Sequence, residues 1–178
     1  DDVNKVISMD VKKPGDVVYV LGETKDEMGG SEYLALKGQL GATVPTVDPV
    51  VGRKLYTQLA SAIEAGLVAS CHDCSDGGLG VTLAESAFAG GFGMDLDIRP
   101  LGLESNVVAL FSESHSRLVA TVSADRSAAF EKTLEGSAVT RLGTVTEEAC
   151  FALTGVQGAQ IVAPLADLKE AWQSPLRW

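Results

Sequence analysis

The stretch from Cys71 to Leu79 constrains this chain most, because it places polar side chains and two glycines between two apolar segments. The run from Ala65 to Ser70 predicts a short buried strand, and Leu79, Leu83 and Ala87 share one face of a predicted helix. The polar residues then follow a strand, where the first amides of the next helix are unpaired and carry partial positive charge. Such a junction can hold a phosphate directly, or through a cation bound by carboxylates.

The same residues also have a purely structural interpretation. Asp73 or Ser75 would cap the helix, while Gly77 and Gly78 would form a tight turn. In a ligand site, by contrast, the two glycines would let the backbone approach a ligand closely. Spacing alone leaves both interpretations open.

Composition predicts one domain over residues 1–178, since 46% of the residues are hydrophobic and fill a single core. A formal net charge of -10 argues against a nucleic-acid surface, because phosphates would be repelled. No apolar run approaches the length of a membrane span, and Asp1–Lys5 lacks the features of a signal peptide. These observations predict a cytoplasmic protein that binds neither nucleic acid nor membranes.

Cys71, Cys74 and Cys150 give an odd cysteine count, and a core of this size does not need disulfides. We expect reduced thiols. A zinc site is disfavoured, because His72 and His115 are the only histidines that could complete a Cys71–Cys74 ligand pair.

Strand and helix patterns alternate irregularly, which favours an α+β fold with a mixed β-sheet over a doubly wound parallel sheet. Asp48 and Pro49 predict the start of a helix that stops at Gly66. The predicted strands cover residues 17–22, 67–74, 94–98, 118–122, 139–145 and 150–153, and further helices cover 124–134 and the segment from Leu165 to Trp172. Gly29 and Gly30, beside Ser31 and Glu32, predict either a second ligand-facing turn or an ordinary loop.

Three motifs in this order resemble the C-terminal half of phosphoribosylformylglycinamidine synthase, an enzyme of purine biosynthesis. They are Gly-Gly-Ser-Glu-Tyr-Leu at 29–34, His-Asp-Cys-Ser-Asp-Gly-Gly-Leu at 72–79, and Leu-Phe-Ser-Glu-Ser at 110–114 with Arg117. Residues 13–19 and 168–172 are similar to the ends of that enzyme's last domain. The resemblance implies the fold of the aminoimidazole ribonucleotide synthase C-terminal domain. The Ser75–Gly78 segment distinguishes the chain from selenophosphate synthetase, thiamine-monophosphate kinase and the hydrogenase maturation factor of the same superfamily.

The resemblance implies an ATP-dependent carbon–nitrogen ligase. In that family ATP activates the formamide oxygen of formylglycinamide ribonucleotide, and ammonia derived from glutamine replaces it to give the amidine. ATP and Mg²⁺ are then the implied cofactors, with Asp73 and Asp76 as candidate Mg²⁺ ligands. His115 is a candidate general acid or base, or alternatively a hydrogen-bonding side chain. The implied substrate- or nucleotide-binding residues are Gly29, Gly30, Ser31, Glu32, His72, Ser75, Asp76, Gly77, Gly78, Glu113, Ser114 and Arg117.

The family's full enzyme resembles a tandem duplication, and this chain is similar to the last of its four domains. We therefore expect a fragment that is inactive without the remaining domains and that can pair as a homodimer. The Ser114–Arg117 segment resembles the short form of the enzyme, which implies a separate glutaminase subunit and a small bridging subunit. Two alternatives stay open: a non-catalytic scaffold or structural-nucleotide-holding domain, and a small-molecule kinase of the same superfamily.

Overall fold

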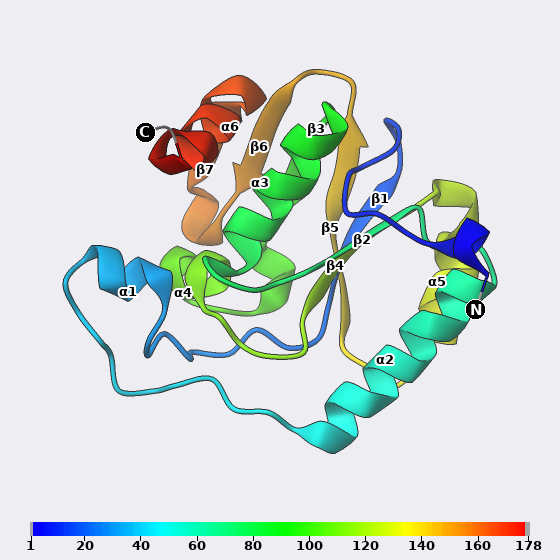
Figure 1. Ribbon diagram of the computed structural model, residues 1–178, viewed down its shortest axis with the longest axis horizontal. Helices are drawn as coiled ribbons and strands as arrows, with labels where there is room; N and C mark the ends of the chain where they lie inside the picture. Colours follow the sequence, from blue (N-terminus) through cyan, green and yellow to red (C-terminus); the bar gives the residue numbers. More distant parts are fainter. Residues whose placement is uncertain (1, 177–178) are drawn as a thin grey trace.

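β1, Val17–Leu21, lies inside a seven-stranded sheet, and all five of its residues are buried. The structure is a computed structural model that describes residues 2–176 (Figure 1). The strand order is β2-β4-β1-β5-β3-β6-β7, and every pair is antiparallel except β3 with β6. The other strands are β2 Ser70–Asp73, β3 Gly93–Asp97, β4 Leu118–Val122, β5 Val139–Thr146, β6 Cys150–Thr154 and β7 Gln160–Pro164.

Helices cover both faces of this sheet (Figure 1). They are α1 Glu32–Leu36, α2 Pro49–Glu64, α3 Gly78–Gly90, α4 Asn106–Phe111, α5 Ser127–Thr133 and α6 Leu165–Gln173. Short 3₁₀ turns lie at Val3–Lys5, Arg99–Leu101, Ala124–Arg126, Val156–Gly158 and Ser174–Leu176. No helix within residues 2–176 is both long and apolar enough to cross a membrane.

Alternation along β1 divides the core into two layers. Val18 and Val20 pack in the layer formed with α3, α4 and α6. Val17, Tyr19 and Leu21 pack in the opposite layer, with α2 and α5. Because both faces of β1 are covered, its sequence is continuously apolar rather than alternating. The predicted α+β fold with a mixed sheet is confirmed.

The strand predicted before the polar motif begins later than expected. The amide of Leu67 donates to the carbonyl of Ala62 at 3.0 Å, which closes the end of α2 and keeps Leu67 out of the sheet. β2 therefore starts at Ser70, and Cys71, His72 and Asp73 pair with β4 within the strand. Cys71 to Asp73 therefore lie in the strand, within the predicted range 67–74, whereas the expectation from the run 65–70 that they follow the strand is wrong.

Sequence patterns did not reveal α1, α4 and β7. α1 and α4 have five and six residues, which is too short for a helical period to emerge. β7 ends at Pro164, and proline weakens any strand prediction; the strand is tolerated because it lies at the edge of the sheet.

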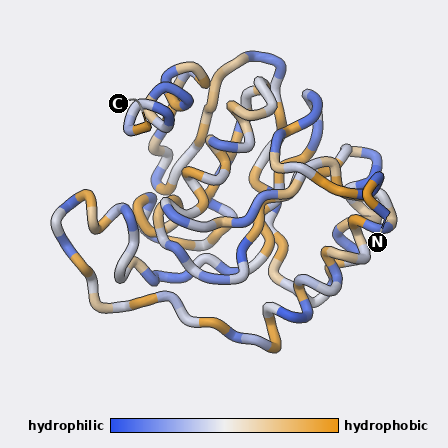
Figure 2. The backbone as a smooth tube through the Cα atoms, in the orientation of Figure 1, coloured by the Kyte–Doolittle hydropathy of each residue, from blue (hydrophilic) through white to orange (hydrophobic). Residues whose placement is uncertain are grey.

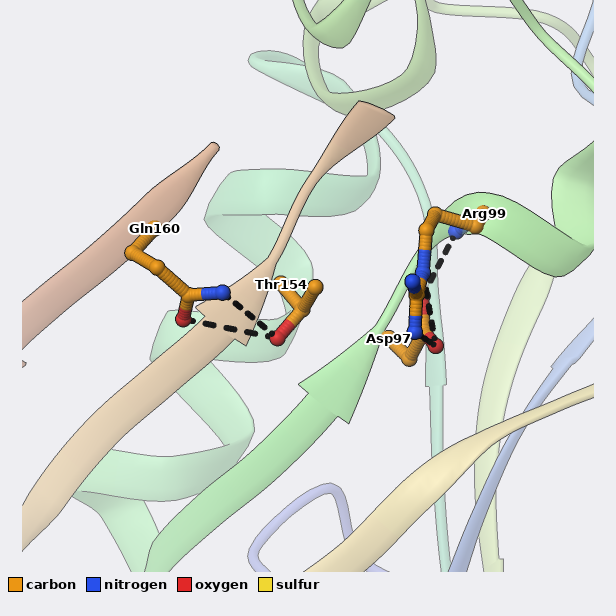
Figure 3. Close-up of polar contacts among 4 residues, drawn as sticks. All are labelled: Asp97, Arg99, Thr154 and Gln160. Carbon is orange, nitrogen blue, oxygen red and sulfur yellow. Dashed lines mark hydrogen bonds and ion pairs between the residues drawn. The ribbon is translucent and has the colours of Figure 1, made fainter. Parts of the chain in front are cut away.

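Local polar contacts mark the ends of β3, β6 and β7 (Figure 3). The guanidinium of Arg99 pairs with the carboxylate of Asp97, with Nη2 2.6 Å from Oδ2. Gln160 Nε2 donates to Thr154 Oγ1 at 3.1 Å across the β6–β7 pair. Both contacts are exposed, so we expect them to order these strand ends locally and to contribute little to the free energy of unfolding.

Asp16, just before β1, is a buried carboxylate that opposes folding. Its side chain is fully buried, and neither oxygen has a hydrogen-bond partner within residues 2–176. Burial raises the pKa of Asp16, although Lys13 Nζ, 4.0 Å away, favours the charged form. The folded chain therefore binds this proton more tightly than the unfolded chain, and stability falls as pH rises through the folded-state pKa.

We expect Asp16→Asn to raise the free energy of unfolding at pH 7 by about 1 kcal/mol, because it removes a buried ionised group that lacks hydrogen-bond partners. The gain should vanish below about pH 4, where Asp16 is protonated in both states. Urea unfolding at both pH values measures this, with Asp95→Asn on the exposed side of β3 as control. A variant no more stable than the parent at pH 7 would contradict it.

Candidate functional site

The predicted ligand-binding turn lies between β2 and α3. Asp73 ends β2 with a side chain that is 73% exposed, and Ser75 and Asp76 are also exposed. Gly77 is the N-cap of α3, with φ 80° and no side-chain cap. The interpretation of Asp73 or Ser75 as the helix cap is therefore wrong, and their polar groups face solvent instead.

One carboxylate joins all three sequence motifs. Glu113 Oε1 accepts hydrogen bonds from the backbone N–H of Gly77 at 2.8 Å and from that of Glu32 at 2.9 Å. Gly77 precedes α3 and Glu32 is the first residue of α1. The structure thus brings Glu32, Gly77 and Glu113 together, and the anion beside the Gly77 amide is a side chain of the protein itself.

Position 78 requires glycine because another segment of the backbone lies very close to it. Its φ is 65°, and a Cβ placed there would lie 2.4 Å from the carbonyl oxygen of Ser112. The backbone that approaches this glycine is therefore the segment before Glu113, where the sequence allowed a ligand.

Buried serines attach the loop after β1 to the segment that follows α4. Ser112 Oγ donates to the Lys25 carbonyl at 2.6 Å, and Ser114 Oγ accepts from the Lys25 amide at 3.0 Å. Both hydroxyls are buried. Ser114, predicted to bind a ligand, makes these contacts within the protein.

Arg117 lies inside the protein and is only 1% exposed. Its guanidinium donates from Nε to the Ser114 carbonyl at 3.0 Å, from Nη1 to Thr24 Oγ1 at 2.9 Å, and from Nη2 to the Ser112 carbonyl. Burial lowers the pKa of Arg117, and no carboxylate within residues 2–176 forms a salt bridge with it. We assign Arg117 to holding the two loops in place.

His72 belongs to a polar chain that links β2, α3 and α6. Its Nε2 lies 2.8 Å from Glu85 Oε2, and its Nδ1 lies 3.4 Å from Asp73 Oδ1. Trp172 Nε1 donates to Glu85 Oε1 at 2.7 Å. The orientation of the imidazole beside Asp73 is therefore fixed by a glutamate and a tryptophan that sequence reasoning missed.

The remaining predicted residues divide between buried and exposed positions. The amide of Gly29 donates to the Thr43 carbonyl at 2.6 Å, and Ser31 Oγ caps α1. Gly30 is exposed, and so is His115, which makes no hydrogen bond within residues 2–176. The structure leaves His115 accessible and uses Gly29 and Ser31 internally, and the exposed Gly30 donates its amide to the Leu40 carbonyl at 2.7 Å.

The exposed carboxylates at the turn fit Mg²⁺ better than they fit a transition metal. Asp73 and Asp76 offer hard oxygen ligands, and Mg²⁺ commonly uses one or two carboxylates together with water and phosphate oxygens. In the described residues, no group of three or more His, Cys, Asp or Glu is arranged for a metal. Burial raises the pKa of Cys71 to about 12 and also raises that of Cys74, so neither offers a thiolate.

The sequence did not identify Glu27 and Glu85 as buried polar residues, because their neighbours in the chain suggest ordinary environments. Glu27 follows Lys25 and Asp26, a pattern typical of a solvated loop, yet it is only 6% exposed. Glu85 sits among the apolar residues of α3, and a lone carboxylate in such a helix was the available signal for a buried polar contact.

Several solved structures share this fold. PurL from Thermotoga maritima complexed with FGAR superposes with a TM-score of 0.80 at 18% identity, covering 93% of this chain and 30% of that chain. PurLQS from Thermotoga maritima gives 0.77 at 18% identity, covering 94% and 28%. The hydrogenase maturation protein HypE in complex with ATP gives 0.63 at 17% identity, covering 90% and 53%. This chain therefore spans less than a third of the PurL chains that it matches.

At such low identity these superpositions show the fold alone. A second comparison concerns the sequence itself: residues 13–155 match the family described as AIR synthase related protein, C-terminal domain. That range contains β1 to β6, the Glu113 contacts and all three motifs. The chain belongs to the AIR synthase related protein C-terminal domain family.

Proposed function

We propose that this chain is the C-terminal domain of a phosphoribosylformylglycinamidine synthase. The proposed reaction is the ATP-dependent conversion of formylglycinamide ribonucleotide to its amidine, with ammonia derived from glutamine. The observation that carries the proposal is the Glu113 carboxylate, which binds one amide from each of the two glycine-containing motifs. The fold shared with PurL complexed with FGAR supports it.

The exposed groups of the site suit a ligand that carries phosphates. Mg²⁺, when bound, would neutralise phosphate charge, and Asp73 and Asp76 are the carboxylates that would hold it. Ser75 and His115 are exposed, so they would donate to or accept from substrate oxygens. Glu85 would keep the imidazole of His72 oriented beside Asp73.

The proposal also requires partners. Large apolar side chains are exposed along the segment from α1 into α2, where hydrophobic positions recur in Figure 2. They are Leu36, Leu40, Val44, Val47, Val50, Val51 and Tyr56. We propose that the rest of the enzyme covers this surface, and that in the isolated chain a second copy covers it instead. We also propose that separate glutaminase and bridging subunits act with the enzyme, which is cytoplasmic.

We expect the isolated 178-residue chain to form no amidine from formylglycinamide ribonucleotide, ATP and ammonia, because its motifs supply one wall of a site. The complete polypeptide should form the product under the same conditions. Chromatographic detection of the amidine measures both. Product from the isolated chain would contradict the claim that it is a dependent domain, and absence of product from the complete polypeptide would reject the proposed reaction.

A second candidate function, a non-catalytic scaffold, is favoured by one observation. The Glu113 carboxylate already occupies the Gly77 amide, where a bound phosphate would be expected at the start of α3. In a duplicated enzyme, a half in which a side chain replaces the phosphate would support the working half instead of performing the reaction.

Replacing Asp73 and Asp76 separately with Asn in the complete enzyme distinguishes the two functions. A catalytic site should lose at least about a hundredfold in turnover, the scale of one positioned electrostatic group. A scaffold should retain turnover within about tenfold. Both variants should keep the parental melting temperature, because the exposed carboxylates cap nothing. Turnover and melting temperature are measured beside the Asp95→Asn control.

A further inference from the structure

A cavity of about 260 Å³ lies beside the candidate site but includes none of the Glu113 contacts. Its wall comes from the loop after β1, the start of α2, residues 114–116 and the segment before β5. Most of the side chains around it are polar or charged. They include Glu23, Lys25, Glu27, Thr46, Asp48 and Lys54.

Glu27 lines this cavity, and one of its carboxylate oxygens lacks a hydrogen-bond partner within residues 2–176. The residue is 6% exposed, and its Oε1 accepts hydrogen bonds from Thr46 N at 3.2 Å and from Thr46 Oγ1 at 3.0 Å. Its Oε2 is buried and has no partner within residues 2–176. Buried carboxylate oxygens are normally paired, so Oε2 calls for a donor.

Glu27 stays ionised at neutral pH. Burial alone would raise its pKa, but the nearby Ser114, Thr46 and Lys25 favour the charged form and leave the pKa below its usual value. The unpaired Oε2 therefore belongs to a negatively charged group. A positively charged donor forms a stronger hydrogen bond with such a group than a neutral donor does.

The same cavity presents the opposite charge. Lys25 lines it and forms no salt bridge within residues 2–176. Lys54 also lines it, and its ammonium donates to the Gly136 carbonyl. The two lysines disfavour a simple cation and the three carboxylates of Glu23, Glu27 and Asp48 disfavour a simple anion, so a ligand that carries both charges suits this lining better.

We propose that this cavity binds a small zwitterion of the α-amino-acid class. The ligand's ammonium would pair with the carboxylate of Glu27, and its carboxylate would pair with Lys25. The cavity volume lies below the roughly 300–1,000 Å³ of pockets for drug-sized ligands, which suits a molecule of this size.

The test is a titration of the ¹⁵N-labelled 178-residue chain with glycine, L-alanine and L-serine at constant ionic strength. We expect at least one of them to shift the amide resonances of Lys25, Glu27 and Thr46 in a saturable way. Methylammonium and acetate, which each carry one of the two charges, should bind at least about tenfold more weakly, since each loses a charge-assisted contact.

Two variants assign the contacts. Glu27→Gln keeps an oxygen for Thr46 but removes the charge, and Lys25→Met removes the ammonium while leaving the Lys25 backbone contacts to Ser112 and Ser114 intact. Each substitution should weaken binding of the zwitterion at least about tenfold. The matched control, Glu147→Gln at an exposed position, should bind as the parent does.

Three results would overturn the proposal. No saturable shift with any of the three amino acids means that the cavity holds water only. Binding of methylammonium or Mg²⁺ as tight as that of the amino acids makes it a cation site. Equal binding by the parent and both folded variants, with unchanged amide spectra elsewhere, places the ligand outside this cavity.

Discussion

Arg117→Leu is expected to destabilise the folded chain by about 3 kcal/mol, because three acceptors lose a charged donor inside the protein. Those acceptors are the carbonyls of Ser112 and Ser114 and the hydroxyl of Thr24. Removing the buried charge recovers part of its desolvation cost, which keeps the loss below the sum of three charged hydrogen bonds. Urea unfolding at pH 7 gives the difference directly.

Arg99→Leu provides the matched control, because Arg99 also pairs through its guanidinium but lies at the surface. That variant should leave the free energy of unfolding close to that of the parent, because an exposed ion pair contributes little. Equal effects at the two arginines would show that burial of Arg117 carries no special energetic weight.

Glu113→Ala is expected to cost about 2 kcal/mol, since the amides of Gly77 and Glu32 lose their acceptor. Hydrogen exchange at these two amides should accelerate more than exchange elsewhere in α3. Glu113→Gln retains an oxygen acceptor, so it should recover most of the lost stability. This difference separates loss of the acceptor from loss of the charge.

Glu104→Ala is the control for that pair, because Glu104 is an exposed glutamate before α4 whose side chain forms no hydrogen bond or ion pair within residues 2–176. It should leave both stability and exchange at Gly77 unchanged. If Glu113→Ala behaves as Glu104→Ala does, the three motifs are held together by packing, and the bridging carboxylate is incidental.

Local sequence patterns predicted the long elements well. The apolar run of β1, the Asp48–Pro49 start of α2 and the face of α3 that carries Leu79 and Leu83 all appear as expected. Each of these signals is contained within about one element length, so the chain needs no distant partner to reveal it.

The contacts of the candidate site were less accessible to sequence reasoning. The motifs were recognised as a set, but Glu113 reaches Glu32 across a separation of 81 residues and Gly77 across 36. Nothing local distinguishes a glutamate that will accept two backbone amides from one that will contact a substrate. Likewise, the sequence predicted that a ligand could approach Gly78 closely, whereas the close neighbour in the structure is the Ser112 carbonyl, which only the tertiary fold brings there.

The order of the strands also determines when this chain can fold. β1 comes early in the sequence, but both of its neighbours, Leu118–Val122 and Val139–Thr146, come more than 95 residues later. During synthesis the most apolar strand must therefore wait, unpaired, until most of the chain has left the ribosome. Such long-range pairing slows folding, and until it forms the exposed apolar segment is prone to non-native pairing and aggregation. We therefore expect the nascent chain to benefit from chaperones that cover Val17–Leu21 until the two neighbouring strands have been synthesised.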